Sequence, residues 1–217
     1  IVTKEYVGGM EIGFVHPSLY KNISGNVKGA FFVYETYPVP EKWVKEINEK
    51  LDICIVPSEF VKKLAVKSGV KTEIEVIPYV VQRKSENRKR KPGEVFKFKS
   101  IATPHKRKNI PFMLHAFLEV FYERKDVKFI LKTFPNKEHS DLKYWEEDID
   151  HLKEQYGNYE NVEIIDEFFT DEEIDEFIQD ADCYVQVSAS EGFGISIFES
   201  VSRGIPVIAT DYGGHQE

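Results

Sequence analysis

Short apolar runs alternate with segments of helical periodicity along most of the chain. Runs bounded by polar or turn-forming residues are typical of buried strands, whereas apolar positions three or four residues apart indicate helices. The expected strands are 12–15, 30–34, 53–56, 74–77, 95–102, 127–131, 162–165, 183–187 and 205–209. The expected helices are 41–51, 59–67, 112–124, 141–156, 171–179 and 195–203. This alternation predicts the α/β class, with parallel sheets and right-handed crossovers.

Residues suited to helix ends flank several of these segments. Ser58 and Thr170 stand where an N-cap side chain accepts a backbone N–H, and we expect Ser58 to serve only as such a cap. Gly69 and Gly204 follow the last periodic positions of two helices, where glycine is favoured. These local signals agree with the periodicity.

One segment interrupts the pattern. Residues 82–93, QRKSENRKRKPG, contain no apolar side chain and end in Pro-Gly, which is typical of a linker. We therefore predict a first domain over 1–81 and a second over 94–217, joined by this basic linker. No βα unit precedes the first expected strand and the chain starts at Ile1 rather than Met, so we expect a fragment whose first domain is incomplete at its start.

The composition is that of a globular protein. Of the 217 residues, 41% are hydrophobic, which is ample for a core. No stretch approaches the roughly 20 apolar residues of a membrane span, and no signal peptide opens the chain. Cys54 and Cys183 fall in expected strands of different halves, so we expect two buried thiols rather than a disulfide. These features predict a soluble, cytoplasmic protein.

The net charge of −8 conceals a strong asymmetry. The net charge is 0 over 1–81, +9 over 82–110 and −17 over 111–217. The large acidic remainder argues against nucleic acid as a partner. The basic segment suits an anionic ligand or peripheral contact with a membrane surface, although a run of charges is more often simply solvated.

The candidate chemistry gathers in the turn between the expected strand 183–187 and the expected helix 195–203. Gly192 and Gly194 flank Phe193 there, and a residue without a Cβ lets the backbone come close to a ligand. The first backbone N–H groups of the helix have no intrahelical partner, and with the helix dipole they form an anion site that suits phosphate. Parallel sheets bind ligands at such carboxyl-end turns.

Two carboxylates bracket this turn. Glu191 precedes it and Glu199 lies inside the helix, with seven residues between them. A helical rise of about 1.5 Å per residue allows a separation of up to about 12 Å. A ligand with sugar hydroxyls at both ends and a diphosphate between them fits this spacing, but two arbitrary glutamates are more often a solvated loop residue and a solvated helix residue.

The carboxyl-terminal residues resemble the E-x7-E signature of the retaining glycosyltransferases of family 4, which have the GT-B fold. The matching positions are Glu191, Gly192, Phe193, Gly194, Glu199, Gly204, Pro206, Val207, Ala209, Thr210, Gly213, Gly214 and Glu217. The resemblance implies that Glu191 contacts the donor sugar and that Glu199 binds the ribose hydroxyls of the nucleotide. It also implies that the backbone of Gly192 to Gly194 binds the sugar and the phosphates, within the anion site that the N–H groups from Gly192 to Ile195 form.

The segment after the first strand of the second domain supplies cations. Lys106, Arg107 and Lys108 suit a diphosphate, because arginine binds bidentately and lysine as a point charge. In the family this loop carries an arginine and, five residues later, a lysine followed by glycine. Aligning Lys108 with that lysine puts Thr103 at the arginine position and Asn109 at the glycine position. Either Arg107 or Lys106 then supplies the second charge, or the diphosphate is bound more weakly.

The amino-terminal residues also resemble the family, at the end of its acceptor-side Rossmann-like domain. The matching positions are Tyr34, Glu35, Pro40, Trp43, Val56, Pro57, Ser58, Glu59, Phe60, Val76, Ile77 and Pro78. Glu35 falls at a polar loop position of that domain and is the candidate acceptor contact. A strand-end carboxylate without a part in the reaction is the alternative for this single position.

The resemblance implies a GT-B enzyme with two Rossmann-like parallel-sheet domains, the second incomplete at its end. It would move a hexosyl group from a GDP- or UDP-sugar to a glycan, lipid or protein acceptor, with retention of configuration and without a metal or cofactor. Lys108 and Arg107 would stabilise the departing diphosphate, and Glu191 would act at the sugar. No convincing set of metal ligands forms around the histidines His105, His115, His139 and His151.

Three alternatives remain open on the sequence. A nucleotide-sugar epimerase of the same fold would use the same pocket but needs acid and base groups against the sugar, and no histidine is placed for that. An inactive nucleotide-sugar-binding module would account for Thr103 at the arginine position. A protein that binds polyanions or membrane surfaces through residues 82–110 would show steep salt dependence.

Overall fold

The computed structural model describes residues 9–82, 90–134, 142–157 and 159–217. The predicted basic linker falls largely on residues 83–89, which lie outside the described residues. No helix in the described part of the chain is long and apolar enough to cross a membrane.

The chain divides into two compact units. The first unit contains the residues up to Val80 together with Glu191–Gly194 and Tyr212–Glu217. The second unit contains Val81–Ser190 and Ile195–Asp211. Two short carboxyl-terminal segments therefore group with the amino-terminal unit, and the domain limits drawn from the sequence stay a prediction.

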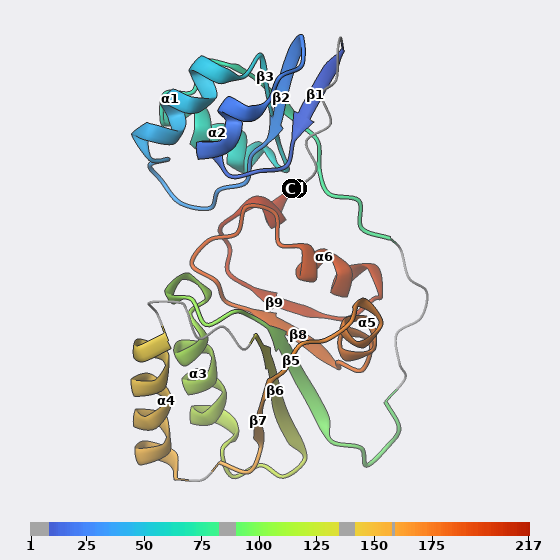
Figure 1. The fold of residues 1–217 in the computed structure, drawn as a ribbon. Helices are drawn as coiled ribbons and strands as arrows, with labels where there is room; N and C mark the ends of the chain where they lie inside the picture. The colour runs from blue at the N-terminus through green and yellow to red at the C-terminus, as the bar shows by residue number, and fades with distance from the viewer. Residues whose placement is uncertain (1–8, 83–89, 135–141, 158) are drawn as a thin grey trace. The chain divides into compact units, whose positions relative to one another are not determined.

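The first unit is built on a parallel sheet with strand order β1-β2-β3-β4 (Figure 1). Its strands are β1 (Met10–Gly13), β2 (Val27–Phe31), β3 (Ile53–Val56) and β4 (Glu73–Val76). They are joined by the 3-10 helix η1 (Pro17–Asn22) and the helices α1 (Glu41–Lys50) and α2 (Glu59–Lys67). Ser58 caps α2 as predicted, because its side chain accepts the N–H of Val61 at 3.2 Å.

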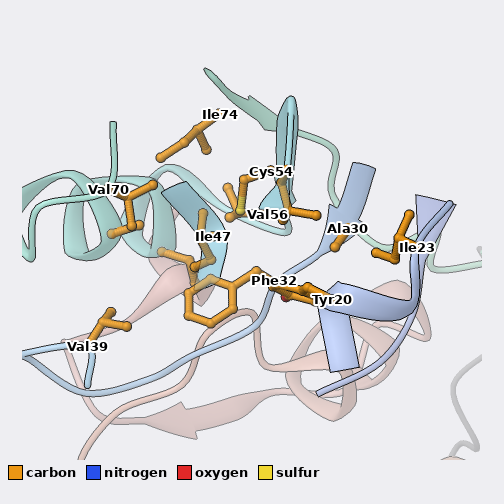
Figure 2. Packing of buried hydrophobic residues seen from close by; sticks show 13 residues of the cluster. Tyr20, Ile23, Ala30, Phe32, Val39, Ile47, Cys54, Val56, Val70 and Ile74 are labelled. Carbon is orange, nitrogen blue, oxygen red and sulfur yellow. The ribbon is translucent and has the colours of Figure 1, made fainter. Parts of the chain in front are cut away.

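One face of this sheet carries the core of the first unit. Ala30, Cys54 and Ile74 occupy equivalent positions on three neighbouring strands and are buried. They belong to one cluster with Ile47 of α1 and Tyr20 of η1, as Figure 2 shows. Because successive strand residues point to opposite faces, Ala30, Cys54 and Ile74 lie on the same face of the sheet, where they join the cluster with η1 and α1.

The second unit is built on a parallel sheet with strand order β7-β6-β5-β8-β9. Its strands are β5 (Phe96–Ile101), β6 (Val127–Thr133), β7 (Val162–Asp166), β8 (Cys183–Gln186) and β9 (Val207–Ala209). Its helices are α3 (Ile110–Phe121), α4 (Leu142–Tyr156), α5 (Asp171–Gln179) and α6 (Ile195–Ser202). The predicted βαβ alternation is confirmed over this unit.

Helices cover both faces of the second sheet (Figure 1). Phe129 and Leu131 of β6 pack in one cluster with residues of α3 and α4. Ile130 of β6 and Tyr184 of β8 pack in the other cluster with residues of α5 and α6. A sheet buried on both faces reads as a nearly continuous apolar run, which is why its strands were visible in the sequence.

The observed elements match the expected ones apart from their ends. The largest shift is in β2, expected at 30–34 and found at Val27–Phe31. Its first residues pair with β1 although they include a lysine and a glycine, whereas the apolar residues after Phe31 leave the ladder. The 3-10 helices were not expected. Cys54 and Cys183 are free, buried thiols, as predicted.

Candidate functional site

The order of strands in the second unit creates a switch point. From β5 the chain moves outward through β6 to β7, and it then returns to place β8 against the other side of β5. The loops that leave β5 and β8 at their carboxyl ends therefore run in opposite directions. Open parallel sheets bind ligands in the crevice formed at such a point.

The loop after β5 brings cationic side chains to this edge. Lys106–Lys108 form the short 3-10 helix η2, and the His105 side chain caps it by accepting the N–H of Arg107 at 3.1 Å. Asn109 follows in the left-handed conformation, with φ of 56°. This conformation is tolerated by asparagine and lets the chain turn directly into α3.

The same loop is fastened to the loop after β8. The Arg107 guanidinium donates to the Ser190 carbonyl at 2.6 Å, and the Ala189 N–H donates to the Arg107 carbonyl at 2.8 Å. The Asn109 side-chain amide donates to the Val187 carbonyl at 3.4 Å. These bonds hold the predicted cationic loop against the segment that leads to the glycine turn.

Buried hydroxyls line this edge without protein partners. The Oγ atoms of Ser100, Ser188 and Ser190 are buried, and none is hydrogen-bonded to any residue in the described ranges. Ser100 lies near the end of β5, and the other two serines lie just after β8. Such orphan hydroxyls are uncommon in native structures, where a buried polar group is normally bonded to protein, water or ligand.

Helix α6 is anchored to the same edge. Ser196 in its first turn donates to the Gln186 side chain at the end of β8, at 2.8 Å. Near its end, Arg203 donates to the Glu199 carbonyl at 2.6 Å and forms an ion pair with Asp175 at 2.5 Å. Glu199 is thus carried on a helix whose two ends are both fixed within the second unit.

The predicted residues of the second unit fall into two groups. Thr103, Arg107 and Lys108 are half-buried on the loop after β5, while Ile195 is exposed and Glu199 half-buried on α6. The structure places both groups on segments that meet the carboxyl edge of β5 and β8. Their roles towards a donor stay predictions.

The glycine turn groups with the first unit. Glu191 has only 6% of its surface exposed, and Phe193 is also buried. A Cβ on Gly192 would lie 3.1 Å from the Val33 side chain and 3.3 Å from the Tyr34 carbonyl. This glycine thus permits close packing against the protein itself. The turn bends at Gly194, whose φ of 84° favours glycine.

Ser58 does more than cap α2. Its hydroxyl also donates to the Gly192 carbonyl at 2.6 Å, a contact between residues 134 positions apart. The expectation that Ser58 serves only as a cap is therefore wrong. The periodicity that revealed the cap contains no signal for a partner so distant in sequence.

The last signature residues pack against the same places. The Gly214 N–H donates to the Glu191 carbonyl at 2.8 Å, and a Cβ on Gly214 would overlap the Gly192 carbonyl and the Ser58 hydroxyl. The Glu217 carboxylate accepts the N–H groups of Glu59 and Phe60, at 2.7 and 2.6 Å, at the start of α2. A carboxylate at a helix N-terminus is favourable because it satisfies unpaired N–H groups and interacts with the helix dipole.

Glu35 lies near an aromatic group within the first unit. Burial and the nearby Glu35 carboxylate raise the pKa of Tyr79. The Tyr79 ring packs edge-on against Phe193 with ring centroids 5.3 Å apart. The structure thus brings together the candidate acceptor residue Glu35 and Phe193 of the glycine turn through a shared neighbour.

Metal-ligating side chains do not cluster in the residues that the structure describes. Three or more histidine, cysteine, aspartate or glutamate side chains nowhere converge there as they would around an ion. Of the histidines considered from the sequence, His139 lies outside the described residues. Whether the reaction needs a metal stays untested.

A family model matches the chain over residues 81–217, which is more than half of its length. The family is described as glycosyl transferases group 1. Among curated proteins there is no match to the chain.

Solved structures of glycosyltransferases share the fold. The match to trehalose-6-phosphate from E. coli bound with UDP-2-fluoro glucose has a TM-score of 0.70 and 12% identity, covering 87% of this chain and 54% of that one. The match to Anabaena HepE in complex with UDP-glucose has a TM-score of 0.68 and 16% identity, covering 88% of this chain and 55% of that one. The match to the pneumococcal O-GlcNAc transferase GtfA in complex with UDP and GlcNAc has a TM-score of 0.64 and 16% identity, covering 89% of this chain and 39% of that one.

These likenesses establish the fold. The α/β fold of GT-B type predicted from the sequence is confirmed. The chain spans about half or less of the length of the solved chains it matches.

Proposed function

The chain belongs to the group 1 glycosyltransferases, and from this premise we propose that it transfers a hexosyl group from a nucleotide diphosphate sugar to an acceptor, with retention of configuration. The donor nucleotide binds at the carboxyl edge of β5 and β8 in the second unit. The sugar is taken by Glu191 and the glycine turn, and the acceptor by residues that include Glu35.

The observation that supports the proposal is the combination of cationic side chains and buried hydroxyls at the switch point of the second sheet. A cationic loop is fixed there by the bond from Arg107 to the Ser190 carbonyl, beside the buried hydroxyls of Ser188 and Ser190. Phosphate oxygens accept hydrogen bonds from both kinds of group. A diphosphate therefore satisfies the charge of this edge and the unpaired hydroxyls together.

The same residues suit the departure of the nucleotide. As the anomeric bond breaks, negative charge grows on the diphosphate, and preorganised donors stabilise it without having to reorganise. Lys108 and Arg107 supply this positive charge on a loop that is already fixed. Thr103, at the position where the family carries arginine, offers a neutral hydroxyl instead.

Solved structures with the same fold support our choice of donor base. Those of the E. coli, Anabaena and pneumococcal proteins contain UDP or a UDP-sugar. We favour a UDP-sugar over a GDP-sugar on this ground. Glu199 on α6 is assigned to the ribose hydroxyls, because a carboxylate accepts two hydroxyl hydrogens at once.

Calorimetric titration of the chain with UDP, GDP and ADP, with and without EDTA, tests the proposal. We expect UDP to bind most tightly and EDTA to leave its affinity unchanged, since cations and hydroxyls replace the metal. Binding that disappears with EDTA would refute the metal-independent site. Absence of binding by all three nucleotides to a folded chain would favour an inactive module.

Substitutions locate the nucleotide. Lys108→Ala should weaken UDP binding by about 1–3 kcal/mol, the range for hydrogen bonds to charged groups, while the affinity for uridine changes little. Glu199→Gln should lower the affinities for UDP and for uridine to the same extent. Lys153→Ala, on α4 and paired with Asp150, is the matched control and should change neither affinity. Equal binding by all variants would show that the nucleotide lies elsewhere.

A further inference from the structure

A cavity lies at the edge of the second unit's sheet that is opposite to the proposed donor site. Its volume is ≈ 400 Å³, within the range of small-ligand pockets. Its walls come from the residues just before β5 and β7, from the start of β6 and from the ends of α3 and α4, so it lies at the amino ends of these strands. None of the residues assigned to the donor lines it.

Asn161 gives this cavity a fixed polar group. Its side-chain Nδ2 donates to the carbonyls of Phe121 and Arg124, at 2.5 and 3.3 Å. Because the nitrogen faces two acceptors, the amide cannot be turned over without opposing oxygen to oxygen. Its Oδ1 is buried and has no partner in the described part of the chain, and the whole residue is only 8% exposed.

Three tyrosines, Tyr122, Tyr156 and Tyr159, also line the cavity. The hydroxyl of Tyr159 is buried and, like the Asn161 oxygen, lacks a partner among the described residues. The rings of Tyr122 and Tyr156 lie with their centroids 5.8 Å apart. Tyrosine offers an apolar face together with a polar tip, which matches a ligand that has both carbon–hydrogen faces and hydroxyls.

The charges around the cavity are largely balanced. Arg124 pairs with Asp126 at 2.6 Å, and Lys128 pairs with Glu163 at 2.5 Å. The carboxylates Glu123 and Glu160 also line the cavity, together with a third cation, Lys125, so that carboxylates and cations are nearly equal in number there. Paired cations and nearby carboxylates disfavour a phosphate or another anion. The two buried orphan oxygens instead call for a ligand that donates hydroxyl hydrogens.

We propose that this cavity binds a neutral saccharide, as a carbohydrate site separate from the donor site. Sugar hydroxyls donate to the Asn161 Oδ1 and bond to the Tyr159 hydroxyl, while a pyranose ring stacks on Tyr122. Because this site is defined by the walls of the cavity alone, it does not depend on the proposed transfer reaction.

Ligand-observed NMR by saturation transfer tests this site with maltose, cellobiose and lactose as probes. Inorganic phosphate and UDP serve as anionic comparisons. We expect at least one disaccharide to bind with Kd on the order of 1 mM, and an excess of UDP should leave its signal unchanged. Competition by UDP would place the sugar in the donor site and overturn the proposal, as would binding of phosphate in place of the sugars.

Three variants decide whether this cavity is the site. Tyr122→Ala should weaken disaccharide binding at least tenfold. Tyr159→Phe should weaken it several-fold without loss of stability, since it removes a hydroxyl that has no partner among the residues that the structure describes. Phe112→Ala, an exposed aromatic residue elsewhere on α3, is the matched control and should change nothing. Saccharide binding unaffected by both tyrosine variants would overturn the proposal, as would no binding of any disaccharide to the parent chain.

Discussion

The two sheets use their carboxyl edges differently. In the first unit the strands follow one another in sequence order, so no strand reverses direction of progression across the sheet. In the second unit β8 returns to the side of β5 that β6 leaves open. Among the strands that the structure describes, the switch point at which parallel sheets bind ligands therefore lies in the second sheet.

The polar groups follow the same division. The edge of the second sheet holds buried serine hydroxyls without partners in the described residues. In the first unit, near the glycine turn, the Ser58 hydroxyl donates to the Gly192 carbonyl and the N–H groups at the start of α2 donate to Glu217. One part of the family signature therefore packs backbone against backbone, and the part on α6 is the one that we propose to face a ligand.

The largest effect is expected from Gly214→Ala. The added Cβ would overlap the Gly192 carbonyl and the Ser58 hydroxyl, and backbone cannot move aside as a side chain can. We expect a loss of about 3 kcal/mol in the free energy of opening of this segment, the upper range for overpacking. Amide hydrogen exchange of Glu59 and Phe60, whose N–H groups bond to Glu217, measures it.

A second glycine separates the clash from backbone strain. Gly157 has a positive φ, of 69°, which Gly214 does not have, and a Cβ at Gly157 would meet no atom within 4 Å. Gly157→Ala should therefore cost only about 1 kcal/mol, from conformation alone. Equal effects of the two substitutions would contradict the close-packing role of the signature glycine.

The next effect concerns a buried ion pair in the second unit. Burial opposes ionisation of Asp180, but hydrogen bonds from Lys97 and Lys99 outweigh it and lower the pKa of the carboxyl. Lys99 is itself buried and would lose its partner in Asp180→Asn. We expect a loss of about 1–2 kcal/mol at neutral pH, less than for a fully buried pair because Asp180 keeps 36% of its side chain exposed.

The sign of the pH dependence follows from the lowered pKa of Asp180. A depressed carboxyl pKa contributes stability above the unfolded value of about 3.9, and this is lost as the pH falls through the folded value. Urea unfolding of the parent and of Asp180→Asn should therefore differ at pH 7 and converge below about pH 4. A difference that persists in acid would show that the asparagine disturbs packing instead.

How far the sequence predicts this molecule depends on the range of the interactions. Periodicity and caps identified every regular helix and strand in the described residues, because these depend on neighbours a few positions away. The contacts of Ser58 with Gly192 and of Glu217 with Glu59 join residues 134 and 158 positions apart. No local pattern encodes them. The cavity at the amino ends of β5, β6 and β7 could not be predicted for the same reason, since its walls come from segments that are distant in sequence.

The ligand-binding role that we propose for the carboxyl edge of the second sheet predicts a trade-off between stability and UDP affinity. Ser188→Ala removes a buried hydroxyl that has no partner in the described residues. We expect the free energy of unfolding to stay equal or to rise by up to about 1 kcal/mol, because an unsatisfied polar group is costly to bury. The affinity for UDP should fall several-fold. A variant that loses stability without losing affinity would mean that the hydroxyl supports the fold.

The smallest effect is expected at the edge of the first sheet. Glu35→Gln keeps the size of the side chain and removes the charge that helps to raise the pKa of Tyr79. We expect the Tyr79 pKa to fall towards its ordinary value in a spectrophotometric titration, because less negative charge then opposes tyrosinate formation. The affinity for UDP should stay within about twofold of the parent, a change of roughly 0.4 kcal/mol or less. A large loss of UDP affinity would place the nucleotide against the first unit, and the contrast between the two edges would then fail.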